Sequence, residues 1–77
     1  MNVVKMKNRD IERTYSTAQF IEKLRRLADC LEKSEQFDIQ IAGERIYVPQ
    51  HAVFNIEHER DGAQEEIEFQ IKWNNKA

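Results

Sequence analysis

Close to the C-terminus of this 77-residue chain the sequence reads Glu66-Ile67-Glu68-Phe69-Gln70-Ile71-Lys72-Trp73. Apolar side chains alternate strictly with polar ones throughout this stretch. A period of two is typical of a β-strand that has one buried face and one solvated face. The stretch therefore indicates where the core lies, but it names neither a reaction nor a ligand.

A preceding segment predicts the partner of this strand, in a hairpin over residues 52–73. Asp61-Gly62 favours a two-residue type I′ turn. Pairing outward from that turn sets Ile56 opposite Ile67, apolar against apolar. The next pairs outward are also apolar, so one face of the hairpin is expected to join the core.

A second hairpin is predicted over residues 37–48, ahead of the first one in the chain. Glycine at the first position of Gly43-Glu44 suits a type II′ turn. This turn places Ile41 opposite Ile46. Pro49 ends the strand because it has no N–H to donate to a sheet.

A helix is predicted over residues 17–33. Ser16 is a good N-cap, and Gln19 completes a capping box with it. Apolar residues then recur at steps of three and four, as one stripe along the helix. The stripe comprises Phe20, Ile21, Leu24, Leu27, Ala28 and Leu31.

Residues 1–14 allow two interpretations: a short edge strand, or a tail that is flexible over residues 1–8. The predicted fold class is α+β, with residues 1–77 as a single domain. One amphipathic helix packs on one face of a four- to five-stranded antiparallel sheet, in the order β-α-β-β-β-β. The predicted core comprises Phe20, Ile21, Leu24, Leu27, Ala28, Leu31, Phe37, Ile39, Ile41, Ile46, Val48, Phe54, Ile56, Ile67, Phe69, Ile71 and Trp73.

Three segments together resemble the amphi-Trp domain family: Leu-Arg-Arg-Leu-Ala-Asp-Cys-Leu-Glu in the helix, the stretch from Phe37 to Pro49, and the stretch from Ile56 to Trp73. The family is named for an amphipathic strand that ends in tryptophan, which matches residues 67–73 here. The resemblance covers about residues 15–73. It implies the fold but no biochemical activity, and it transfers no catalytic residue.

Composition favours a soluble cytoplasmic protein. The chain has no apolar run long enough to span a bilayer and no signal-peptide pattern. Its one cysteine cannot form an internal disulfide, as expected in a reducing compartment. The net charge of −2 is unevenly spread, with +3 over residues 1–33 and −5 over residues 34–77. These halves predict a basic helix side and an acidic sheet side.

Nothing in the sequence predicts a catalytic, cofactor or metal site. His51 and His58 lack the spacing of zinc ligands, and Cys30 has no activating base near it in sequence. The predicted register places His58 opposite Glu65, as a pair with mild pH sensitivity. Trp73 is interpreted as sealing one end of the core, with an interface anchor as the alternative.

Exposed surfaces are the remaining candidates for a site. Tyr47 and Val53 are predicted to form an apolar spot on the open sheet face. The same face is acidic, with Glu57 opposite Glu66. The candidate interaction residues are Tyr47, Val53, Glu57, Glu66 and Glu68 on the sheet, and Lys23 and Arg26 on the helix.

These observations favour a small non-enzymatic binding or protein-interaction domain. The expected partner is an unidentified protein, or a second copy of the chain that binds through a sheet edge. No interaction with a membrane is expected. The alternative is a weak nucleic-acid-binding accessory protein that uses the basic helix side. Against the alternative stand the net negative charge and the acidic residues interleaved along the same helix.

Overall fold

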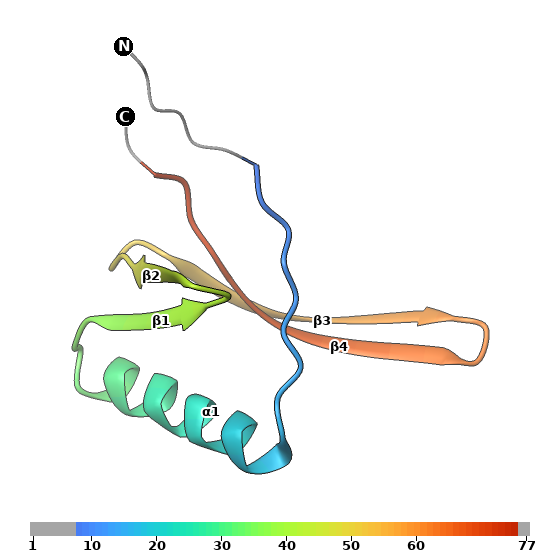
Figure 1. Cartoon of the computed structure of the whole chain (residues 1–77). Helices are drawn as coiled ribbons and strands as arrows, with labels where there is room; N and C mark the ends of the chain where they lie inside the picture. Colours follow the sequence, from blue (N-terminus) through green and yellow to red (C-terminus); the bar gives the residue numbers. More distant parts are fainter. Residues whose placement is uncertain (1–7, 76–77) are drawn as a thin grey trace.

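The protein, described here by a computed structural model over residues 8–75, consists of one helix followed by two β-hairpins. The elements are α1 (Thr17–Glu32), β1 (Phe37–Ile41), β2 (Glu44–Val48), β3 (Val53–Asp61) and β4 (Gln64–Lys72). The helix lies along the first hairpin, while β3 and β4 extend well beyond both (Figure 1). The predicted α+β class with one helix and antiparallel strands is confirmed.

Both ends of α1 are closed by local hydrogen bonds. The Gln19 amide donates to Ser16 Oγ at 3.2 Å, and the Ser16 amide donates to Gln19 Oε1 at 3.1 Å, so the predicted capping box is present. At the other end Ser34 has a φ of 55°, and the Glu35 amide donates to the Cys30 carbonyl at 2.8 Å. This is the Schellman arrangement, with serine in the position that glycine usually occupies.

The first hairpin pairs two residues away from the predicted register. Ile39 lies opposite Ile46, and Ile41 lies opposite Glu44 instead of Ile46. The two central turn residues are therefore Ala42-Gly43, with φ of 47° and 86°. Positive φ at both positions defines a type I′ turn, so the predicted type II′ turn at Gly43-Glu44 is wrong.

The second hairpin is displaced from its predicted register by the same amount. Ile56 lies opposite Phe69 instead of Ile67. The central turn residues are Gly62-Ala63, of which only Gly62 has a positive φ, as in a type II′ turn. The predicted type I′ turn at Asp61-Gly62 is therefore wrong. Because the displacement is two residues, every side chain stays on its predicted face.

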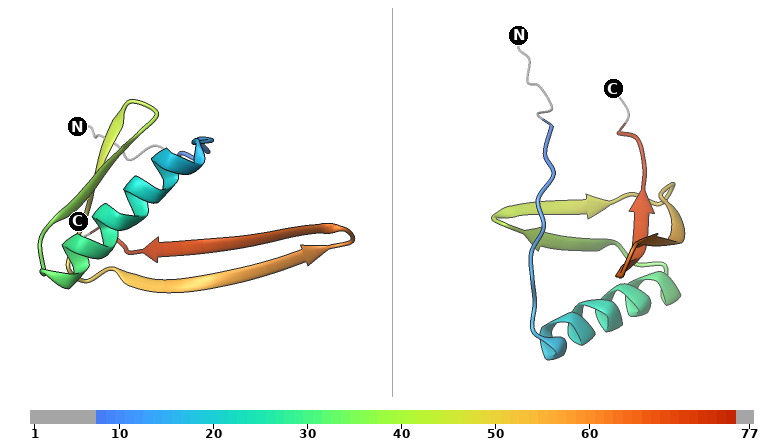
Figure 2. Two further views of the ribbon diagram at one scale, coloured as in Figure 1. Left: turned by 90° about the horizontal axis from the view of Figure 1, so that it is seen from below. Right: turned by 90° about the vertical axis from the view of Figure 1, so that its right-hand side faces the viewer.

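The four strands form two separate two-stranded sheets, so the predicted single sheet of four to five strands is absent from the described residues. Pro49 has no N–H for a sheet, and a turn follows it in which the Ala52 amide donates to the Pro49 carbonyl at 3.2 Å. The second hairpin consequently leaves in a direction that crosses the first (Figure 2). Residues 8–16 are not a strand, and the tail predicted at residues 1–8 lies almost wholly outside the described part of the chain.

Very few of the predicted core residues are buried. Within residues 8–75 only Phe37 and Ala52 are buried, with 5% and 8% of their surface exposed. The radius of gyration is 14.9 Å, whereas a compact domain of this length has about 11 Å. The predicted core residues share the expected faces, but those faces stay open.

The register of the first hairpin can be tested by changing Ala42 to asparagine. A residue with a side chain is strained at a positive φ, whereas Asn-Gly is the preferred type I′ pair. We expect Ala42→Asn to raise the free energy of unfolding by about 1 kcal/mol. Urea denaturation at a fixed protein concentration measures the change.

Ala63→Asn is the matched control in the other turn, because the φ of Ala63 is not positive. It should give no comparable gain. If Ala42→Asn is neutral, the type I′ turn at Ala42-Gly43 is refuted.

Candidate functional site

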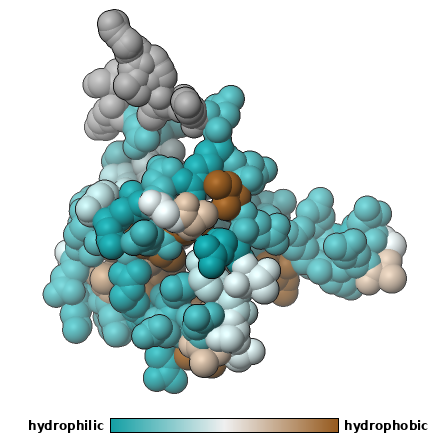
Figure 3. Space-filling view, in the orientation of Figure 1, coloured by the Kyte–Doolittle hydropathy of each residue, from teal (hydrophilic) through white to brown (hydrophobic). Residues whose placement is uncertain are grey.

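A groove lined by apolar side chains runs between α1, the first hairpin and β4, and we name it the apolar groove. It has a volume of about 590 Å³. Its apolar walls are formed by Phe20, Leu24 and Leu27 of α1, by Ile39, Ile41, Ile46 and others of the first hairpin, and by Ile67, Phe69 and Ile71 of β4. Apolar side chains accordingly reach the surface among polar ones (Figure 3). The groove is the predicted core, left uncovered.

A second hollow of about 560 Å³ lies between α1 and the base of the second hairpin. Leu27 and Leu31 line it from the helix, and Phe54 and Ile56 line it from β3. Leu27 and three residues of β4, Phe69, Gln70 and Ile71, also line the apolar groove. The two hollows therefore form one apolar surface, which follows the stripe of the helix.

The second hairpin, residues 53–72, projects away from the rest of the molecule, and we name it the arm (Figure 1). One of its faces is apolar over much of its length. Ile56, Ile67 and Phe69 on this face each expose 66% of their surface. These are large values for side chains that alternate with polar residues in a strand, so the arm lacks the cover that its sequence pattern implies.

Three charged or polar side chains form a network on the same face near the tip of the arm. His58 Nε2 lies 2.7 Å from Glu65 Oε1, and Arg60 Nε donates to Glu65 Oε2 at 2.9 Å. The predicted pairing of His58 with Glu65 is thus present as a contact, although the strand register sets His58 opposite Ile67. The hydrogen bond from Arg60 is the main cause that lowers the pKa of Glu65, and His58 adds to it.

The opposite face of the arm is acidic, as predicted, but its cross-strand pairs of glutamates differ from the predicted ones. Glu57 lies opposite Glu68, and Glu59 lies opposite Glu66, instead of Glu57 opposite Glu66. The negative charge of Glu68 raises the pKa of Glu66, and removal of solvent and the nearby Glu59 act in the same direction. The face therefore repels other anions and offers charge to a cation.

Tyr47 and Val53 do not form the predicted spot on adjacent strands. Both are exposed, with 61% and 62% of their surface accessible. They belong to β2 and β3, however, which are in different sheets. The structure brings together the residues of the apolar groove instead.

Lys23 and Arg26 both lie against aromatic rings. Lys23 Nζ is 4.7 Å from the centre of the Tyr15 ring, and the Arg26 guanidinium is 4.7 Å from the centre of the Phe37 ring. Cation–π contacts of this kind hold the two cations along the groove side of α1. Lys23 also lines the apolar groove itself.

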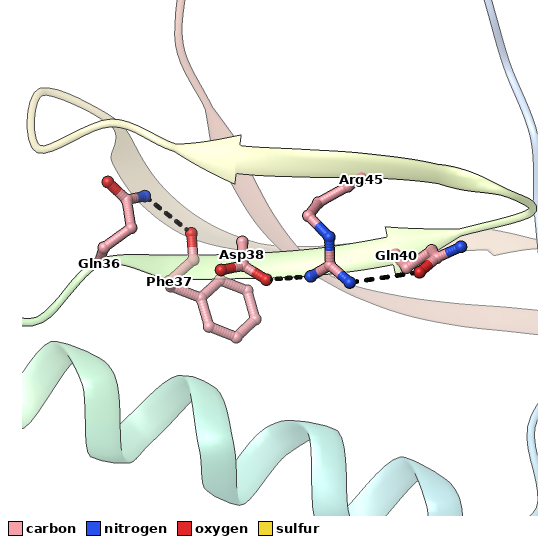
Figure 4. Close-up of polar contacts among 5 residues, drawn as sticks. All are labelled: Gln36, Phe37, Asp38, Gln40 and Arg45. Atoms are coloured by element: carbon pink, nitrogen blue, oxygen red, sulfur yellow. Dashed lines mark hydrogen bonds and ion pairs between the residues drawn. The ribbon is translucent and has the colours of Figure 1, made fainter.

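The first hairpin is braced by polar contacts on its strands. Arg45 donates to Asp38 and also to Gln40, and the Gln36 side chain donates to the carbonyl of Phe37 (Figure 4). The Phe37 ring points from β1 toward the helix in the same view. The polar side chains of β1 therefore lie on one face of the strand, and the Phe37 ring lies on the face toward α1.

Trp73, at the end of the predicted amphipathic strand, follows β4 and lines the apolar groove. Its indole N–H donates to Asn75 Oδ1 at 3.0 Å. His51 Nε2 lies 3.1 Å from the Asn74 carbonyl. In the described part of the chain no group of three or more His, Cys, Asp or Glu side chains is placed to hold a metal ion.

One contact could not be inferred from the sequence. Arg9 pairs with Glu44 and also donates to the carbonyl of Ile41, so the segment before α1 is tied to the first hairpin. The two partners are 35 positions apart, and no periodic signal links them. Nothing short of the folded arrangement would have revealed this pairing.

The whole described chain is covered by one family match. The model of the Amphi-Trp domain matches residues 4–77, and the chain therefore belongs to the Amphi-Trp domain family, as the sequence resemblance indicated. No curated protein and no solved structure matches it. Across residues 8–75, no helix has both the length and the apolar character that crossing a membrane requires.

The two glutamates at adjacent positions of β4 should titrate on opposite sides of the ordinary glutamate value of 4.5. We expect Glu65 below it and Glu66 above it in an NMR titration of the carboxyl carbons. Since the folded pKa of Glu65 is lowered, its stabilising contribution is present above the ordinary value and is lost as the pH falls. For Glu66 the sign is opposite, so its charge destabilises the arm as the pH rises.

Arg60→Ala should move the pKa of Glu65 back toward its ordinary value. Arg45→Ala, which removes an arginine of the other hairpin, is the control and should leave it in place. An unchanged Glu65 titration in Arg60→Ala would contradict the network at the arm tip.

Proposed function

We propose that this chain is a non-enzymatic protein-interaction domain, located in the cytoplasm, that associates with itself through the apolar groove and the apolar face of the arm. The observation that carries the proposal is the open core, with only Phe37 and Ala52 buried among residues 8–75. Exposed apolar faces of this extent mark interaction surfaces in soluble proteins. Among the described residues, Lys23 and Glu68 are the only charged ones that line the groove, and this favours binding over catalysis.

The exposed area supports association of two chains. The accessible surface is 6961 Å². A compact protein of the same mass, 9.2 kDa, exposes about 4,900 Å². The excess is about 2,000 Å² per chain, or about 4,000 Å² for two chains, which lies in the range of total area that obligate dimers bury. We propose that the packing of the helix on a larger sheet, as expected from the sequence, is reached in this assembled state.

Nucleic-acid binding through Lys23 and Arg26 remains the alternative. Both cations lie against aromatic rings, and the arm carries an acidic face. A phosphate backbone would meet repulsion from that face. Retention on a heparin column that falls with salt, and that Lys23→Ala with Arg26→Ala abolishes, would favour the alternative; we expect no such retention.

Self-association is tested by sedimentation at low and high protein concentration. We expect a dimer at micromolar concentration, and an unfolding midpoint that rises with protein concentration, because folding and association are coupled. Ile67→Asp places a charge on the apolar face of the arm and should give a monomer.

Val53→Asp is the matched control. Val53 is exposed to 62%, close to the 66% of Ile67, but it lies on the opposite face of the arm. This variant should remain dimeric. A wild-type monomer at all concentrations refutes self-association, and loss of the dimer in Val53→Asp alone would transfer the interface to the face of the arm that carries Val53.

A further inference from the structure

Strand β4 has one edge without a partner strand. Among the strands of the described chain its only neighbour is β3, and no other helix or strand of residues 8–75 approaches it closely. Asp61 and Gln64 flank the two-residue turn and form a hydrogen-bonded pair. Because the direction of bonding alternates along an antiparallel strand, the N–H and C=O groups of the odd-numbered residues within 65–71 point outward. Such a row of free donors and acceptors is a template for a further strand.

The outer edge of β4 is complementary in charge to a second copy of itself. The polar face of β4 carries Glu66 and Glu68 toward the turn and Lys72 at the far end. When a second β4 lies antiparallel to the first, with Phe69 opposite Phe69, Lys72 lies opposite Glu66. The same register sets Gln70 opposite Glu68. Opposite charges therefore meet at two symmetric places, and no like charges meet.

Resting on the proposed self-association, we propose that two copies join by antiparallel pairing of the outer edges of β4, centred on Phe69. The result is one four-stranded sheet in the order β3-β4-β4-β3. A two-fold axis perpendicular to this sheet relates the copies, so both apolar faces lie on the same side. Ile67 of one copy then lies opposite Ile71 of the other, and apolar side chains of the two arms cover one another. This sheet is larger than either hairpin and offers both helices a wider apolar face.

The pattern of β4 specifies the register of this pairing. A shift of one residue in one copy sets apolar side chains of one strand beside polar ones of the other. Moving the centre toward the turn sets Glu66 opposite Glu68, or Glu68 opposite its own copy, and like charges repel. Moving it the other way, to Gln70, shortens the paired segment of β4 from 66–72 to 68–72. The proposed centre gives the longest pairing without like charges.

The outer edge of β3 is a poorer candidate. Its polar face has three acidic residues and no basic one: Glu57, Glu59 and Asp61. Two copies of β3 side by side would therefore have no cation to oppose these carboxylates. In contrast, β4 supplies Lys72 for Glu66, whose charge Glu68 repels within its own chain. Charge thus selects β4 as the edge that joins the copies.

Charge reversal in two differently substituted full-length chains tests the pairing. Lys72→Glu brings an acidic residue opposite Glu66, and Glu66→Lys brings a basic residue opposite Lys72. Each variant alone should raise the dimer dissociation constant by about tenfold, because two opposite-charge pairs become like-charge pairs. An equimolar mixture restores opposite charges at both places, so sedimentation should show dimers with one copy of each variant. Recovery also shows that both variants fold.

Glu57→Lys is the matched control, because it makes the same change of charge on the same face of the arm, but on β3. This variant alone should remain dimeric. Mixed with Lys72→Glu, it should form fewer mixed dimers than Glu66→Lys does, since a like-charge pair remains at one of the two places. The comparison separates paired contacts from a general attraction between chains of different net charge.

Disulfide formation reports the register. In a Cys30→Ser background, chains carrying Glu68→Cys and chains carrying Gln70→Cys are mixed, unfolded, refolded and oxidised with diamide. The proposed register sets positions 68 and 70 opposite each other with Cα atoms about 4.5 Å apart, within the range that a disulfide spans. Position 68 lies about 7–8 Å from its own copy. The 68–70 link should therefore exceed the 68–68 link by about tenfold, whereas arms packed through their apolar faces would point both positions away from the interface.

The possible failures are separable. A wild-type monomer at all concentrations overturns self-association and the edge pairing together. A wild-type dimer that gives no mixed dimers from the two charge-reversal variants, and no 68–70 link, leaves self-association standing and overturns the edge pairing. A predominant 68–68 link overturns the register centred on Phe69.

Discussion

The burial of Phe37 between α1 and β1 is the contact on which the rest of the arrangement depends. Its ring is the only large side chain buried in the described residues, and the Arg26 guanidinium lies over it. α1 approaches no strand other than β1 closely in that part of the chain. Once α1 is held at β1, Leu24 and the rest of its apolar stripe face away from solvent only if something else covers the groove. A helix of this amphipathic pattern gains most of its stability from such cover.

Local signals were sufficient to predict the elements. Ser16 and Gln19 specify the start of α1, and alternation specifies four strands and their faces. The registers were wrong because a glycine satisfies a positive φ at either central position of a tight turn. Ala42 adopts the left-handed region against its own preference, since the I′ twist of the hairpin outweighs the strain of one residue. The error of two residues kept each face intact, so the apolar surface was predicted correctly while the cross-strand partners were not.

The residues of the candidate site were predictable from the sequence, but their exposure to solvent was not. Periodicity reports which side chains share a face, but it carries no information about what covers that face. The sequence therefore identified the residues of the groove as a core, whereas the structure leaves them open. Tyr47 and Val53 were placed together because two strands consecutive in the chain were taken as neighbours in one sheet. The turn at residues 49–52 separates those strands, and this depends on the direction in which the chain leaves Pro49.

An open core and a regular apolar pattern are compatible if the cover comes from a second copy. The side-chain contacts of a helix with a hairpin are the same whether one chain or two supply them, so the pattern in the sequence does not distinguish the two cases. The open groove between α1, the first hairpin and β4 is therefore the part of the structure on which the proposed self-association rests.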